Sequence, residues 1–210
     1  MKSIKTAFLL CSFAFLMSCK GEKENENATP NFSIEAKQAD WDRNEVDKLV
    51  KDAYKWIEKT DGSKFFRPFV KDSMIVGFDP ISQSLYMKQM QESGYFATEF
   101  RNTIGRIFNK QDELLRSGKA LWHDGELGPF DTGVNQWCNC QDTPTDDYDK
   151  MNVVIEKMTS DTAELYWNWV GFGEDWEQEH YHIKVIKEDG KWKIARMEGW
   201  DYEDNVKVSN

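Results

Sequence analysis

The sequence contains few of the residues from which catalytic and metal sites are usually built. Its 210 residues include three histidines and four cysteines. It contains no nucleophile elbow, no phosphate-binding loop, no His-Glu-x-x-His zinc pattern and no EF-hand spacing. The common hydrolase, nucleotide-binding and calcium-binding designs are therefore not indicated. No catalytic residue, metal ligand or cofactor is predicted.

Positive charge is also scarce. The chain has 27 lysines and arginines against 37 aspartates and glutamates, which gives a net charge of −10. A surface of this sign repels the phosphates of nucleic acids and the head groups of anionic lipids. We therefore expect no nucleic-acid partner, and no basic patch that would hold the protein to a membrane.

No apolar run is long enough to span a bilayer, which requires about 20 residues. The apolar segment 7–17 follows Lys2 and Lys5, the layout of a secretory signal. It ends in "LMSC" (16–19), which resembles the bacterial lipobox. That resemblance implies cleavage before Cys19 and acylation of that cysteine, with palmitate among the acyl chains. An ordinary signal peptide with a chance cysteine is the alternative.

These features predict the organisation of an outer membrane lipoprotein. Residues 1–18 are the signal peptide, 19–40 the lipidated cysteine and a flexible polar tether, 41–204 a single domain and 205–210 a tail. The tether resembles the export signal of surface-exposed bacterial lipoproteins. Both the periplasmic and the cell-surface face remain open.

Helical spacing dominates the first half of the domain. We expect a helix from a capping box at Asp42 to Thr60, a second over 81–93 and a third over 96–115. Residues 65–78 are interpreted as a short strand or loop. The period changes to two at Val153 and stays so to the end of the domain. This order predicts an α+β fold in which helices pack on a curved antiparallel meander.

The turn signal Asp189-Gly190 sets the register of the last hairpin. It places the side chains of His180 and His182 on the outer face, where a metal would need a third ligand, so solvated or interface histidines are the expectation. It places those of Tyr181, Arg196 and Glu198 on the core face. Polar groups there need partners. They form either a salt bridge or a ligand-binding group at a pocket mouth.

Two segments carry a resemblance to known proteins. These are "NCQDTP" (139–144) and "DGKWKI" (189–194) at the end of the meander. With the order of elements, they resemble a bacterial lipoprotein family with domain of unknown function 3828, and more broadly the nuclear-transport-factor-2-like (cystatin-like) α+β roll. The resemblance implies a cone-shaped fold with a pocket between sheet and helices. It implies no known activity.

The segment 119–150 is long and irregular, which is typical of functional loops. It holds Cys138 and Cys140, the only cysteines outside the N-terminal region. Outside the cytosol paired thiols oxidise, so a disulfide is one expectation. Two positions apart, the cysteines need a chain turn to meet. Free thiols or a metal site completed by His123 or an aspartate are the alternatives.

The meander gathers three acidic segments at one end of the sheet: 141–149, 171–179 and 200–204. The residues that we expect to form this acidic rim are Asp146, Asp147, Asp149, Glu174, Asp175 and Trp176. Other acids in the same segments are Asp142, Glu177, Glu179, Asp201, Glu203 and Asp204. Carboxylates among aromatic rings suit cations, sugars or a basic partner. Simple solvation of the charges is the alternative.

The sequence therefore favours a lipid-anchored, non-enzymatic binding module for a small molecule, a glycan or a basic protein. An enzyme that uses Glu198 as acid or base is one alternative. An immunity or inhibitor protein that binds a basic partner is another.

Overall fold

The computed structural model describes residues 31–60 and 67–208. The main elements, in chain order, are α1 (Asn31–Thr60), β1 (Pro68–Lys71), β2 (Met74–Phe78), α2 (Pro80–Ser93), α3 (Thr98–Arg116), η2 (Tyr148–Lys150), β3 (Met151–Met158), β4 (Thr162–Trp169), α4 (Glu174–Gln178), β5 (Tyr181–Glu188), β6 (Lys191–Met197), η3 (Glu198–Trp200) and α5 (Tyr202–Val206). Helices combined with antiparallel sheets confirm the predicted α+β class.

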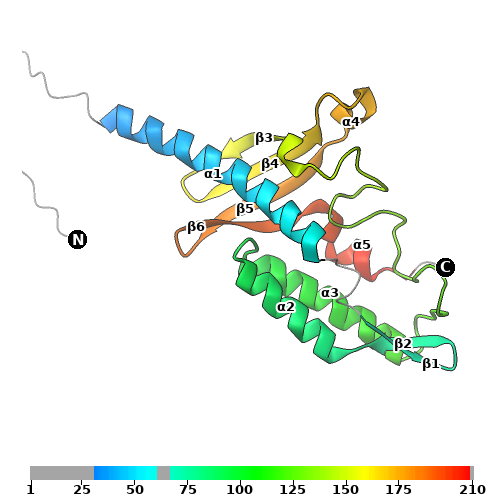
Figure 1. Ribbon diagram of the computed structural model, residues 1–210. Helices are drawn as coiled ribbons and strands as arrows, with labels where there is room; N and C mark the ends of the chain where they lie inside the picture. Colours follow the sequence, from blue (N-terminus) through cyan, green and yellow to red (C-terminus); the bar gives the residue numbers. More distant parts are fainter. Residues whose placement is uncertain (1–30, 61–66, 209–210) are drawn as a thin grey trace, which may run out of the picture.

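The larger sheet is the predicted meander, with strand order β3-β4-β5-β6. Along β4, Leu165 and Trp167 are buried while Glu164 is exposed, so one face of the sheet lies against the core. Helix α1 crosses this face and contacts both β3 and β6, and α3 packs against β6 (Figure 1). The helices and the sheet therefore share one core.

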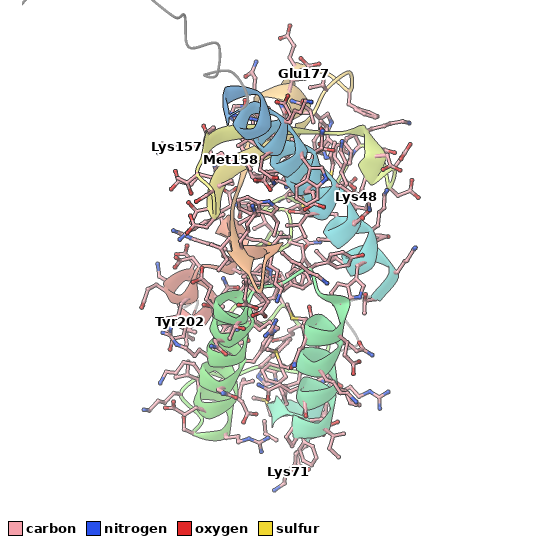
Figure 2. The ribbon with its side chains drawn as sticks, turned by 90° about the vertical axis from the view of Figure 1, so that its left-hand side faces the viewer. Lys48, Lys71, Lys157, Met158, Glu177 and Tyr202 are labelled. Carbon is pink, nitrogen blue, oxygen red and sulfur yellow. A yellow bond between two sulfur atoms is a disulfide. The ribbon has the colours of Figure 1, made fainter. Side chains whose placement is uncertain are left out.

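The smaller sheet is a hairpin of β1 and β2, where the sequence indicated a short strand or loop. Asp72 and Ser73 form its turn, and both have positive φ angles. Lys71 at this hairpin and Glu177 on α4 lie at opposite ends of the molecule (Figure 2). The acidic bend at α4 is therefore far from the hairpin, while Tyr202 in the acidic segment 200–204 lies between the two ends (Figure 2).

Helix α1 begins earlier than predicted. It starts at Asn31, and Asp42 lies inside it rather than at a cap. Residues 35–39, "EAKQA", are strong helix formers, and they continue the helix through a segment that we had expected to be tether. The tether prediction is thus wrong for 31–40, while residues 1–30 lie outside the described part. At the other end, Asn205 is buried in α5, so the domain extends beyond the predicted boundary at Asp204.

A β-bulge corrects the predicted register of the last hairpin. Val185 pairs with Ile194 as expected, but Lys184 then pairs with Arg196, so Ala195 is an extra residue in β6. Because side chains alternate across a strand, this residue moves Arg196 to the outer face. The prediction that Arg196 faces the core is wrong. The outward orientation of His180 and His182 is confirmed, because both are exposed.

Glu188, at the end of β5, caps helix α3. Ala97 at the cap position supplies no side-chain hydrogen bond, and the Glu188 carboxylate accepts one from the backbone N–H of Thr98 at 2.9 Å. Lys193 donates a second at 2.7 Å. The hydrogen bonds from Lys193 and Thr98 lower the pKa of Glu188 to about 2, against the opposing effect of burial. This one carboxylate therefore joins the sheet to the helix.

Glu188→Gln is expected to lower the free energy of unfolding by about 1 kcal/mol at neutral pH, the usual contribution of a charge at a helix N-terminus. The folded state depresses the pKa of Glu188, so its contribution is complete above the ordinary glutamate pKa of about 4.3. It disappears as the pH falls towards about 2. Urea denaturation between pH 7 and pH 2 measures this.

The control is Asp189→Asn, because Asp189 is 90 % exposed and lies 3.9 Å from the same Lys193. Its stability should stay within about 0.5 kcal/mol of the wild type. Parallel pH profiles for Glu188→Gln and the wild type would contradict the capping role.

Candidate functional site

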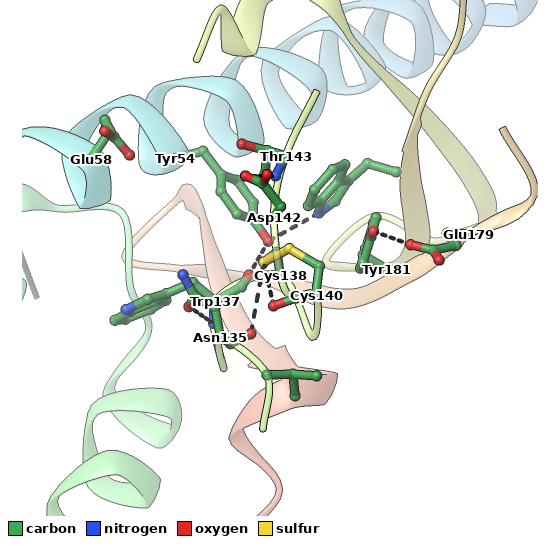
Figure 3. The surroundings of a disulfide bond; sticks show 12 residues. Tyr54, Glu58, Asn135, Trp137, Cys138, Cys140, Asp142, Thr143, Glu179 and Tyr181 are labelled. Carbon is green, nitrogen blue, oxygen red and sulfur yellow. Dashed lines mark hydrogen bonds between the residues drawn. A yellow bond between two sulfur atoms is a disulfide. The ribbon is translucent and has the colours of Figure 1, made fainter. Parts of the chain in front are cut away.

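Cys138 and Cys140 form a disulfide at the centre of the long loop between α3 and η2 (Figure 3). Their Cα atoms are 5.0 Å apart. Asn139 between them has a φ of 51°, and this turn brings the two cysteines within reach of each other. The expected disulfide is confirmed, and the free-thiol and metal-ligand alternatives do not hold.

The disulfide loop is closed by its own hydrogen bonds. The backbone N–H of Asn135 donates to the carbonyl of Cys140 at 2.7 Å, and the side-chain oxygen of Asn135 accepts from the N–H of Trp137 at 2.9 Å. These bonds and the disulfide hold residues 135–140 in one conformation. The polar residues that follow, among them Asp142, are therefore attached to a segment of fixed conformation.

Tyr54 connects this loop to the core. Its hydroxyl donates to the carbonyl of Trp137 at 2.5 Å and accepts from the indole N–H of Trp167 at 3.0 Å. Burial raises the pKa of Tyr54 well above its usual value, so the hydroxyl stays protonated and keeps donating. Helix α1 and strand β4 thus fix the position of the loop (Figure 3).

A groove of about 560 Å³ lies between the disulfide loop and the start of β5. Its lining includes the amides of Asn139 and Gln141 together with three acids and three rings: Asp142, Glu179, Glu198, Trp176, His180 and Tyr181. Its remaining lining residues are neutral, so within the described part of the chain no lysine or arginine lines it. The groove is therefore acidic and aromatic.

Tyr181 forms the floor of the groove on the sheet side. It is buried, stacks on Trp167 with ring centroids 4.2 Å apart, and donates its hydroxyl hydrogen to Glu179 at 2.7 Å. Burial raises the pKa of Tyr181, and the carboxylates of Glu179 and Glu198 raise it further. The hydroxyl therefore remains a donor to Glu179 and orients that carboxylate.

His180 reaches the groove from the outer side of the sheet. Its ring stacks on Tyr166 with centroids 3.8 Å apart and planes 16° from parallel. The sequence predicted its outward orientation but not this stacking, which needs the strand partner to be known. His182 does not line the groove.

The structure brings together only part of the predicted site. Tyr181, Glu198 and Trp176 line the groove as one set. Arg196 does not join them, because the bulge leaves its side chain 68 % exposed and 3.7 Å from Asp201. The predicted pairing of Arg196 with Glu198 on the core face is therefore wrong, but both residues line a separate hollow of about 320 Å³ with the exposed residues His182 and Lys184.

The other residues of the acidic rim lie outside the groove, namely Asp146, Asp147, Asp149, Glu174 and Asp175. Asp149 pairs with Lys55 at 2.5 Å, and Asp147 lies 3.4 Å from Lys150. Glu174 and Asp175 at the start of α4 are exposed. The rim thus contributes charge around the groove rather than contacts inside it.

Two of the three groove acids, Asp142 and Glu179, were named from the sequence only as further acids of the rim segments. Their only signal was membership of the acidic segments 141–149 and 171–179. In residues 31–60 and 67–208, no three carboxylate, imidazole or thiol groups lie close enough together to hold a metal ion. The carboxylates are instead spread along the groove.

Comparison of the chain with models of protein families, with curated proteins and with solved structures gives no match. In the part of the chain that the structure describes, no helix combines the length and the apolar character needed to cross a membrane.

Proposed function

We propose that this protein is a non-enzymatic binding module whose groove captures a ligand through a cationic group, an ammonium or a guanidinium. The observation that carries the proposal is that Asp142, Glu179 and Glu198 all line one groove to which no lysine or arginine of the described residues contributes. Carboxylates bind such donors through charge-assisted hydrogen bonds. The half-buried ring of Trp176 adds a face on which a cation or its methylene groups can pack, and the buried Tyr181 orients the Glu179 carboxylate.

Binding is favoured over catalysis in the groove because Arg196 is not part of its lining. An enzyme built on Glu198 was expected to use Arg196 beside it there, and the bulge turns Arg196 to the outer face, where it shares a separate hollow of about 320 Å³ with Glu198. Glu174 and Asp175 are exposed acids near the groove, and their negative charge attracts cations towards it. They raise the local concentration of a positively charged ligand or of a basic protein.

We also propose that the module is anchored by a lipid on Cys19 in the outer membrane, on its periplasmic or cell-surface face. This rests on the sequence of residues 1–19, which lie outside the described part. The cone-shaped roll of the nuclear-transport-factor-2-like type, and membership of the lipoprotein family with domain 3828, remain proposals. The packing of α1 and α3 on one face of the meander supports them.

The test uses three small probes of equal length and different charge: n-butylamine, 1-butanol and butyrate. Saturation-transfer NMR on the purified protein is expected to detect binding of the amine alone. The variant Asp142→Asn/Glu179→Gln/Glu198→Gln should weaken amine binding at least about tenfold, because each hydrogen bond to a charged group contributes about 1.5–3 kcal/mol.

The matched control is Asp146→Asn/Asp147→Asn/Glu174→Gln, which removes the same charge outside the groove. It should reduce amine binding by less than about threefold, through the weaker long-range field alone. Equal binding of amine and alcohol, or equal losses in the two variants, would rule out the groove as a cation site.

A further inference from the structure

A second hollow of about 510 Å³ adjoins the groove. The two share three lining residues, Val134, Asn139 and Glu198, so they meet at the disulfide loop and the start of η3. The second hollow adds the carboxylates of Asp131 and Asp204. Acidic groups therefore continue past the groove in which the proposed cation is held.

Glu198 stands where the two hollows meet. Gly199 beside it packs so closely on the loop that an added Cβ would lie 2.1 Å from the carbonyl oxygen of Gln136. η3 therefore lies directly against the loop at this point, and Glu198 lies between the two hollows. Within the described residues, the half-buried Glu198 carboxylate makes no hydrogen bond or ion pair, so it can accept from a ligand in either hollow. It also lines a third, smaller hollow of about 320 Å³ that includes Arg196.

The acids form three groups according to the hollow that they line. Asp142 and Glu179 belong to the first hollow, Glu198 to both, and Asp131 and Asp204 to the second. Apolar side chains share the lining with the acids in each hollow, namely Val134 and Trp176 in the first and Val134 and Phe130 in the second. Among the described residues, Lys207 is the one basic residue in the lining of the second hollow.

We infer that the two hollows act as one extended site for a linear polyamine, a chain with two or more ammonium groups separated by short methylene segments. This inference rests on the proposed function and names its ligand class. A single ammonium group can pair with only one of these groups of acids, whereas a chain of ammonium groups can pair with several of them at once. The methylene segments between them pack on the apolar lining.

The test compares n-butylamine, putrescine and spermidine, which carry one, two and three charges at pH 7, by isothermal titration calorimetry. The dissociation constant is expected to fall about tenfold with each added ammonium group, which corresponds to one charge-assisted contact of about 1.4 kcal/mol. Mg²⁺ has the charge of putrescine in one small ion. At equal concentration it should leave spermidine binding unchanged within about twofold.

The variant Asp131→Asn/Asp204→Asn alters the second hollow alone. It should weaken spermidine binding about tenfold or more and leave n-butylamine binding unchanged. Asp131 accepts the backbone N–H of Gly133 at 2.7 Å, and the amide oxygen that Asp131→Asn introduces can accept the same N–H, so the loop should keep its conformation. The control Glu174→Gln/Asp175→Asn removes the same charge outside both hollows and should change neither affinity by more than about twofold.

The outcomes separate this inference from the proposed function. Equal affinities for the three amines, or full spermidine binding by Asp131→Asn/Asp204→Asn, would overturn the extended site and leave the single-cation groove standing. Displacement of spermidine by equimolar Mg²⁺ would also overturn it, because charge alone would then explain binding. Failure of every amine to bind would remove both proposals.

Discussion

Gly199→Ala is expected to lower the free energy of unfolding by about 3 kcal/mol or more, at the upper end of what overpacking costs. The new Cβ would lie 2.1 Å from the carbonyl oxygen of Gln136. The obstructing atom belongs to the backbone and cannot rotate away as a flexible side chain would. Either η3 or the disulfide loop has to move.

Urea denaturation followed by tryptophan fluorescence measures this change, with Gly105→Ala as the control. Gly105 lies inside α3, and the nearest atom to its added Cβ is the Met87 methyl carbon at 4.0 Å. Alanine there should raise stability by about 0.5–1 kcal/mol, because it restricts the unfolded chain and favours the helix. Matching stabilities for the two variants would contradict the close contact at Gly199.

The same substitution has a functional consequence. Glu198 belongs to η3, whereas Asn139 and Cys140 belong to the disulfide loop. If η3 and the loop move apart, the residues that line the groove are separated. Gly199→Ala should therefore lose n-butylamine binding even under conditions in which it remains folded. Retained binding by a folded Gly199→Ala protein would show that the groove does not depend on this contact.

Asp42→Ala is expected to destabilise the protein by about 3 kcal/mol, the usual effect of removing one partner from a buried ion pair. The Asp42 side chain is 7 % exposed, and its carboxylate lies 2.9 Å from the ammonium of Lys187. It also accepts the indole N–H of Trp192 at 3.0 Å. Alanine would leave both donors without their acceptor, and the attachment of α1 to β5 and β6 would weaken.

Asp40→Ala is the matched control, because Asp40 is an exposed acid on the same helix two positions earlier. It should change the unfolding free energy by less than about 0.5 kcal/mol. Thermal or urea unfolding of the two variants gives the comparison. Equal losses of unfolding free energy in Asp42→Ala and Asp40→Ala would mean that the ion pair of Asp42 adds nothing to stability.

The Asp42 contribution should also depend on pH. Burial raises the pKa of its carboxyl group, but the hydrogen bonds from Lys187, Trp192 and Gln38 outweigh burial and the pKa is lowered. The folded state thus favours the ionised form. The stability difference between wild type and Asp42→Ala should be complete above the ordinary aspartate pKa of about 3.9 and shrink as the pH falls below it.

Periodicity predicted much of the fold correctly. Alternation along 163–169 predicted the buried face of β4, and Asp189-Gly190 predicted the turn between β5 and β6. These features depend on neighbours along the chain or on the period of one element, and a single sequence contains that information.

The start of α1 was missed because Asp42 with Glu45 has the pattern of a helix cap. The fold uses the Asp42 carboxylate instead as the partner of Lys187, which is distant in the sequence. The bulge at Ala195 was missed because it adds one residue to a strand without disturbing the apolar pattern at Trp192 and Ile194. One inserted residue was enough to remove Arg196 from the site.

Composition and local pattern alone thus predict an acidic α+β domain, with a disulfide as one reading of its cysteine pair and its acidic segments at one end of a meander. They do not say which of those acids share a groove. That choice depends on the disulfide loop lying against η3 and on the turn of β6 after its bulge. Both are contacts between segments far apart in the sequence, where the packing energy of the whole chain, rather than local preference, selects the geometry.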